Sequence, residues 1–106
     1  NKKTFLLILM QLMTAFGLLA QTTEELNLNG SQGNLFAILQ RPDTVGKTPL
    51  VILCHGFSGN CQSQLFDDIA KNLQQNGIAT LRFDFNGHGK SDGQFQDMTV
   101  LNEIED

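Results

Sequence analysis

The chain has 106 residues, 41% of them hydrophobic, and a formal charge of −4 from seven lysines and arginines against eleven aspartates and glutamates. No basic cluster is present and no aromatic residues alternate with basic ones, so we expect no nucleic-acid partner. The length suits one small domain, whereas an α/β enzyme with a full sheet usually needs a longer chain.

The first twenty residues differ in composition from the rest. A pair of lysines precedes an apolar stretch from Phe5 to Leu19, and the small residue Ala20 follows it. This order is typical of a secretory signal. A membrane anchor is the alternative, but the stretch is short for a membrane span and polar residues such as Gln11 interrupt it. We therefore predict a cleaved signal in residues 1–20, no stable membrane anchor after cleavage, and a secreted or periplasmic protein.

The next segment predicts a β-hairpin. Glu24–Asn29 alternates weakly between polar and apolar residues, Asn29–Gly33 is a cluster of turn-forming residues, and Asn34–Gln40 is apolar enough for a second strand. Arg41–Pro49 contains both prolines of the chain and is expected to be an irregular connector.

A strand, a helix and a second strand are predicted next. Leu50–Cys54 is a continuous apolar run, the pattern of a strand buried on both faces of a parallel sheet. Gln62–Asn76 has helical spacing and Gly77 is suited to follow its end, before a second apolar run, Ile78–Phe83. The predicted apolar face of the helix holds Leu65, Phe66, Ile69, Ala70 and Leu73, opposite Asp67, Asp68, Lys71, Gln74 and Gln75. A further helical pattern begins in Met98–Asp106, with Thr99 as its expected cap.

A glycine-rich turn follows each of these two strands, at residues 55–60 (HGFSGN) and 84–91 (DFNGHGKS). Open α/β folds place their sites at the carboxyl ends of parallel strands. Hydrolysis by a serine enzyme needs N–H donors aimed at the substrate carbonyl oxygen, worth about 3 kcal/mol each. The backbone N–H of Phe57 can supply one, and Gly56 leaves the backbone open to substrate.

We expect His55 to make a local hydrogen bond rather than to transfer protons. In the second turn, we expect Asp84 to hold the loop by hydrogen bonds, while Gly87 and Gly89 allow its bends.

Two other interpretations of these turns each fail at one position. Ser58 lies in a near match to the G-x-S-x-G nucleophile elbow, but Asn60 replaces the second glycine. Gly89-Lys90-Ser91 is similar to the end of a phosphate-binding loop, but Asp84 replaces the first glycine.

The histidines and cysteines do not predict a metal site. Together, His55, His88, Cys54 and Cys61 have no recognised zinc spacing, so no metal is expected. The two cysteines leave a disulfide open, because spacing alone cannot establish the geometry that a disulfide requires.

Residues 55–60, 84–93 and 98–106 carry a resemblance to the α/β-hydrolase superfamily, and within it to bacterial cinnamoyl or feruloyl esterases. The resemblance extends from Glu24 onward. The first two segments also occur in serine aminopeptidase-like and monoglyceride lipase-like members, and the third favours the esterase branch.

This resemblance implies the N-terminal part of an α/β-hydrolase fold, with a hairpin, a parallel strand-helix-strand unit and an incomplete sheet. It assigns the backbone N–H of Phe57 to an oxyanion hole and gives His55 and Gly56 the shaping of that loop. In the family the nucleophile, acid and base come later in the chain. We therefore expect residues 21–106 to stop before the nucleophile and to be inactive alone.

For the full-length protein, the resemblance implies a serine ester hydrolase that needs no cofactor. The expected substrate is a small-molecule or polysaccharide-linked ester, including hydroxycinnamate esters. A serine aminopeptidase-like or monoglyceride lipase-like hydrolase is the first alternative. A non-catalytic exported binding module is an alternative of another class.

Overall fold

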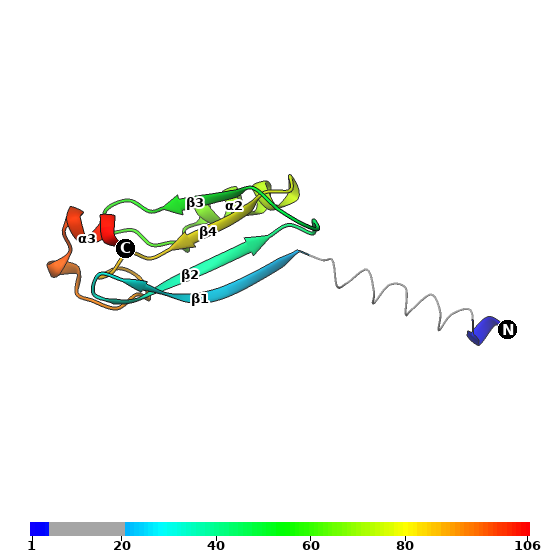
Figure 1. The fold of residues 1–106 in the computed structure, drawn as a ribbon, viewed down its shortest axis with the longest axis horizontal. Helices are drawn as coiled ribbons and strands as arrows, with labels where there is room; N and C mark the ends of the chain where they lie inside the picture. The colour runs from blue at the N-terminus through cyan, green and yellow to red at the C-terminus, as the bar shows by residue number, and fades with distance from the viewer. Residues whose placement is uncertain (5–20) are drawn as a thin grey trace.

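The computed structural model describes residues 1–4 and 21–106. All but the first four residues of the predicted secretory signal therefore lie outside the described residues. Residues 21–106 form a four-stranded sheet with helices on its face and at its end (Figure 1). The elements are β1 (Thr22–Gly30), β2 (Gly33–Arg41), β3 (Leu50–Cys54), α2 (Gln64–Gln75), β4 (Ala79–Phe83), the 3-10 helix η1 (Phe95–Asp97) and α3 (Val100–Glu105).

The predicted hairpin is confirmed, with longer strands and a tighter turn than the sequence suggested. β1 and β2 pair antiparallel from Thr22 opposite Arg41 to Gly30 opposite Gly33, which leaves a two-residue turn. Side chains of β2 point into the core, where Leu35 and Ala37 are buried against aromatic rings from the end of β4. The hairpin therefore supplies one wall of the hydrophobic core.

The strand order β1-β2-β4-β3 joins the hairpin to a parallel pair. β4 pairs antiparallel with β2 and parallel with β3, and in the parallel pair Cys54 lies opposite Phe83. Both predicted turns begin directly after these residues, so they lie side by side at the carboxyl ends of the two parallel strands (Figure 1). The predicted arrangement of a hairpin followed by a parallel strand-helix-strand unit is confirmed.

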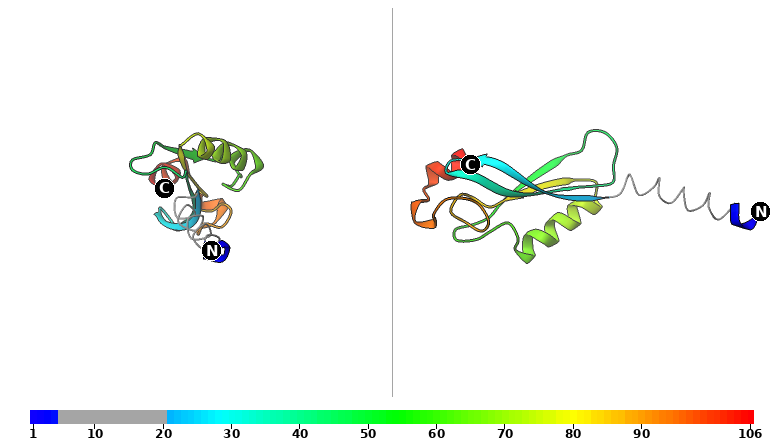
Figure 2. Two further views of the ribbon diagram at one scale, coloured as in Figure 1. Left: turned by 90° about the vertical axis from the view of Figure 1, so that its right-hand side faces the viewer. Right: turned by 90° about the horizontal axis from the view of Figure 1, so that it is seen from below.

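The expectation that Leu50–Cys54 is buried on both faces is wrong in this structure. Leu50 is 53% exposed and Ile52 is 56% exposed. The reason is topological, because β3 is at the edge of the sheet and α2 packs chiefly against β4 and β2 (Figure 2). Its apolar composition is therefore that of a buried strand, whereas its place among the described residues is that of an edge strand.

α2 begins two residues later than predicted, because the side chain of Ser63 caps it by accepting a hydrogen bond from the N–H of Phe66 at 3.3 Å. Gly77 follows the helix end with φ +78°, as expected of a residue just past a helix. The predicted faces are wrong at two positions. Leu65 is exposed, and Gln74 is buried because its side-chain amide donates hydrogen bonds to backbone carbonyls of the hairpin.

The last predicted helix is confirmed over a shorter range, as α3, and Thr99 caps it by accepting a hydrogen bond from the N–H of Asn102 at 3.1 Å. Its apolar residues Val100, Leu101 and Ile104 are exposed. Within residues 1–4 and 21–106, no helix has the length and apolar character needed to cross a membrane.

Candidate active site

The peptide between Gly56 and Phe57 is held in one orientation. The carbonyl oxygen of Gly56 accepts a hydrogen bond from the N–H of Gly59 at 3.0 Å and lies 2.8 Å from Nδ1 of His55. A trans peptide is planar and its C=O and N–H point in opposite directions, so fixing the carbonyl also fixes the N–H of Phe57. This N–H meets no acceptor among the described residues. The first turn thus presents an oriented, free donor.

His55 supplies part of that orientation and connects the two turns. Its Nε2 lies 3.1 Å from the backbone N of Phe85, which is a donor, so Nε2 accepts and Nδ1 carries the hydrogen donated to Gly56. Both ring nitrogens are therefore engaged, one as donor and one as acceptor. No hydrogen bond joins His55 to Ser58 among the described residues. The ring therefore has the contacts of a positioning group and not those of a base for Ser58.

Glycine at position 56 is not required by the local backbone. Gly56 lacks a positive φ, and a Cβ atom built on it would meet nothing within 4 Å. Ser58 instead adopts the left-handed conformation, with φ 55°. The backbone at position 56 therefore does not need glycine to shape the loop, and what Gly56 supplies here is open space beside the peptide.

A buried carboxylate lies between the two turns. Asp84 is 1% exposed and accepts hydrogen bonds from the backbone N–H groups of Cys61, at 2.6 Å, and Lys90, at 2.9 Å. Burial, followed by the hydrogen bond and the charge of Asp84, raises the pKa of the Cys61 thiol to about 12. Asp84 thus connects the start of the second turn to the chain that leads into α2.

The second turn has two glycines with positive φ. Gly89 has φ +48°, and a Cβ atom there would lie 2.2 Å from Oδ2 of Asp84. Gly87 has φ +81°, and its Cβ atom would lie 2.8 Å from the carbonyl oxygen of Gln94. Both positions therefore disfavour any side chain.

Sequence reasoning missed the contacts of Asp106, His88 and Phe95 at this end of the strands. Asp106 accepts hydrogen bonds from the backbone N–H groups of Ser31, at 2.6 Å, and Asn86, at 2.9 Å, and so joins α3, the hairpin turn and the second turn. His88 is buried, with its ring 4.9 Å from that of His55 and 5.2 Å from that of Phe95. No local pattern marks contacts between residues so far apart in sequence.

The residues of the alternative sites are engaged elsewhere or lie apart. The ammonium group of Lys90 lies over the ring of Phe36, 4.8 Å from its centroid, rather than at a phosphate loop. Both cysteines are free, with Cys54 exposed and Cys61 buried. Within residues 1–4 and 21–106, no group of three or more His, Cys, Asp or Glu side chains is arranged to hold a metal.

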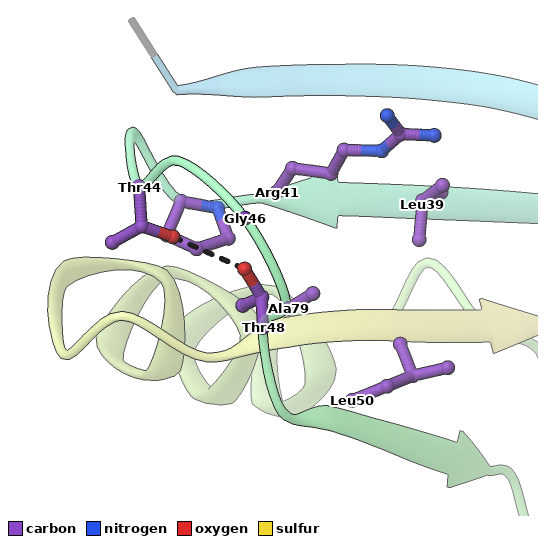
Figure 3. Close-up of a pocket in the computed structure, with 8 residues that line it drawn as sticks. Leu39, Arg41, Thr44, Gly46, Thr48, Leu50 and Ala79 are labelled. Carbon is purple, nitrogen blue, oxygen red and sulfur yellow. Dashed lines mark hydrogen bonds between the residues drawn. The ribbon is translucent and has the colours of Figure 1, made fainter. Parts of the chain in front are cut away.

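A pocket of about 330 Å³ lies at the opposite end of the parallel strands, near Leu50 and Ala79, where β3 and β4 begin (Figure 3). The connector covers it, and the hydroxyl oxygens of Thr44 and Thr48 lie 3.1 Å apart there. Sites in open α/β sheets lie at the carboxyl ends of strands, so we assign the candidate site to the turns.

The sheet order and the two turns after β3 and β4 match the N-terminal part of an α/β-hydrolase fold. The family model described as serine aminopeptidase, S33, matches residues 47–106, which is more than half of the chain. The chain therefore belongs to this family of α/β hydrolases, and the predicted superfamily is confirmed.

Three known proteins illustrate the similarity. An uncharacterized 31.7 kDa protein of the traX-finO intergenic region of Escherichia coli is 40% identical over 60 residues, which are 57% of this chain and 21% of that protein. Est1E from Butyrivibrio proteoclasticus, solved with ferulic acid bound, is 40% identical with a TM-score of 0.64, over 68% of this chain and 29% of Est1E. An α/β serine hydrolase homologue from Coxiella burnetii is 31% identical with a TM-score of 0.66, over 78% of this chain and 40% of that one. The chain thus spans about a fifth of the curated relative and under half of each of these solved structures.

Proposed function

We propose that the full-length protein hydrolyses carboxylic esters through an acyl-enzyme, and that the backbone N–H of Phe57 is one donor of its oxyanion hole. The orientation of the Gly56–Phe57 peptide carries this proposal, because two hydrogen bonds fix its carbonyl and leave its N–H free. Membership of a serine hydrolase family supplies the reaction class.

In the proposed mechanism, a serine activated by a histidine attacks the ester carbonyl, and negative charge develops on the carbonyl oxygen. The N–H of Phe57 donates a hydrogen bond to that oxygen. Water then hydrolyses the acyl-enzyme. Loss of one such donor typically lowers kcat by about 100- to 1,000-fold.

We propose hydroxycinnamate esters as the substrate class. The similarity to Est1E, which was solved with ferulic acid, supports this choice. The family description favours amino-acyl amides as the second candidate.

The experiment compares the full-length protein with the 106-residue chain on methyl ferulate, on a short-chain acyl ester and on an amino-acyl amide. We expect turnover of esters by the full-length protein alone. Preference for the amide would favour the aminopeptidase-like alternative. If the 106-residue chain hydrolyses esters and Ser58→Ala abolishes this turnover, the assignment of the nucleophile to another segment is overturned.

Substitutions at His55 test how the donor is oriented. His55→Asn retains a side-chain N–H close to the place of Nδ1, whereas His55→Leu has none. We expect His55→Leu to lower kcat of the full-length protein by about 100-fold, and His55→Asn to lower kcat by a smaller factor. Equal kcat values for His55→Leu and the wild type would contradict the role of His55 in holding this peptide.

We propose, in addition, that residues 1–20 direct export and are then removed. The apolar stretch after two lysines supports this proposal. Mass spectrometry of the protein recovered from the periplasm or medium should find it shortened. Recovery of the uncleaved protein from the cytoplasm would contradict it.

A further inference from the structure

Six aromatic rings form a continuous row behind and beside the first turn, which we call the ring row. It passes through Phe83, Phe85, His55, His88, Phe95 and Phe57. Neighbouring centroids are 4.9 to 5.3 Å apart and neighbouring planes meet at 53° to 82°. Tilted and edge-to-face contacts at this spacing are the arrangement that aromatic pairs prefer.

The ring row begins in the hydrophobic core and ends at the solvent-exposed surface. Phe83 is buried, whereas Phe95 is 45% exposed and Phe57 is 75% exposed. The open end therefore presents two rings 5.3 Å apart, inclined to each other by 58°. No aromatic ring among the described residues continues the row beyond Phe57.

The open end lies beside the proposed oxyanion donor, because the last ring and the free N–H belong to the same residue, Phe57. A group attached to a carbonyl held by that N–H is within reach of its ring. The two rings at this end belong to phenylalanines and carry no charge. The surface is thus suited to an uncharged, planar group.

We propose that the rings of Phe57 and Phe95 form the specificity surface for a planar, conjugated acyl group, which extends the ring row by one ring. This inference rests on the proposed ester hydrolysis and adds the residues that select the acyl group. Phe95 contacts the substrate directly, supported from behind by His88.

The test uses the full-length protein and two methyl esters of similar size. Methyl cinnamate carries a planar ring, and methyl 3-cyclohexylpropanoate carries a saturated one. Phe95→Leu keeps an apolar side chain but removes the ring. We expect it to lower the preference in kcat/KM for the cinnamate ester about five- to tenfold, because one aromatic contact is lost.

Phe36→Leu is the matched control, because it makes the same substitution at a ring that lies outside the ring row. It should leave the preference unchanged. An equal loss on both esters with Phe95→Leu would show that Phe95 positions the turn rather than the substrate, and would overturn the proposal. An unchanged preference would overturn it as well.

A binding measurement separates this proposal from the proposed function. Titration of wild-type protein and Phe95→Leu with cinnamate should show weaker binding by the variant, whether or not the protein hydrolyses esters. If the protein hydrolyses no ester but its binding of cinnamate depends on Phe95, the proposed function is overturned and the specificity surface is not. Equal binding of cinnamate by both proteins would overturn the specificity surface.

Discussion

Gly56 and Gly89 belong to the two predicted turns, but a methyl group is expected to lower turnover at Gly56 and stability at Gly89. Gly89→Ala places a Cβ atom against the carboxylate of Asp84 in a left-handed backbone. We expect it to lower the free energy of unfolding by about 2–4 kcal/mol, measured by urea denaturation.

Gly56→Ala has room for its methyl group and should change stability by less than about 1 kcal/mol. In a trans peptide, however, the Cα atom of Gly56 lies on the same side as the N–H of Phe57. The methyl group therefore obstructs the approach of an ester oxygen, and kcat/KM of the full-length protein should fall about tenfold or more. Unchanged turnover would show that substrate does not approach this N–H.

The buried thiol of Cys61 should make stability depend on alkaline pH. Burial and the nearby Asp84 raise its pKa from 9.0 to about 12 in the folded protein. Above pH 9 the thiol ionises in the unfolded chain but not in the folded one. Stability is therefore fully present below pH 9 and is lost as pH rises toward 12, by up to about 1.4 kcal/mol per pH unit.

Denaturation at pH 8 and at pH 10.5 would measure this loss. The chain contains no tyrosine, which removes one competing titration. Cys61→Ala should reduce the dependence on pH, whereas Cys54→Ala, at an exposed position, should keep it. The same slope in Cys61→Ala and wild type would contradict the raised pKa.

At the scale of elements, Gln74 joins α2 to the hairpin. Its side-chain amide donates to the carbonyl oxygens of Arg41, at 2.9 Å, and Thr22, at 3.3 Å. Gln74→Ala should cost about 1–2 kcal/mol of unfolding free energy, because two partly buried hydrogen bonds to backbone carbonyls are lost. Gln75→Ala, at the exposed neighbouring position, should cost less than about 0.5 kcal/mol. Similar costs for both variants would contradict this link.

The elements themselves could largely be predicted from local signals. The apolar run in Leu50–Cys54, the turn residues of the hairpin and the cap Thr99 all act within a few residues. The same signals are insufficient for burial, since a run of apolar residues does not specify which elements pack against it. They therefore gave the position of β3 but not its exposure.

Contacts between distant parts of the chain could not be predicted in this way. His55 bonds to Phe85 across 30 residues, and Asp106 bonds to Ser31 across 75. Each contact depends on the parallel pairing that brings the two turns together and on the position of α3. The candidate donor at Phe57 could be named from the sequence, but the groups that orient it become visible only in the fold.

At the scale of the whole molecule, the exposed apolar side chains of β3 make self-association the expected behaviour of the 106-residue chain. An edge strand has unpaired backbone groups, and Ile52 adds an exposed apolar side chain. Ile52→Lys should raise the monomer fraction in sedimentation velocity, because a charged side chain on an edge strand opposes pairing. Val45→Lys makes the same change of charge in the exposed connector and should leave the fraction unchanged. A wild-type chain that is monomeric and unfolds cooperatively would instead favour the exported binding module, since such a chain does not need further strands to cover β3.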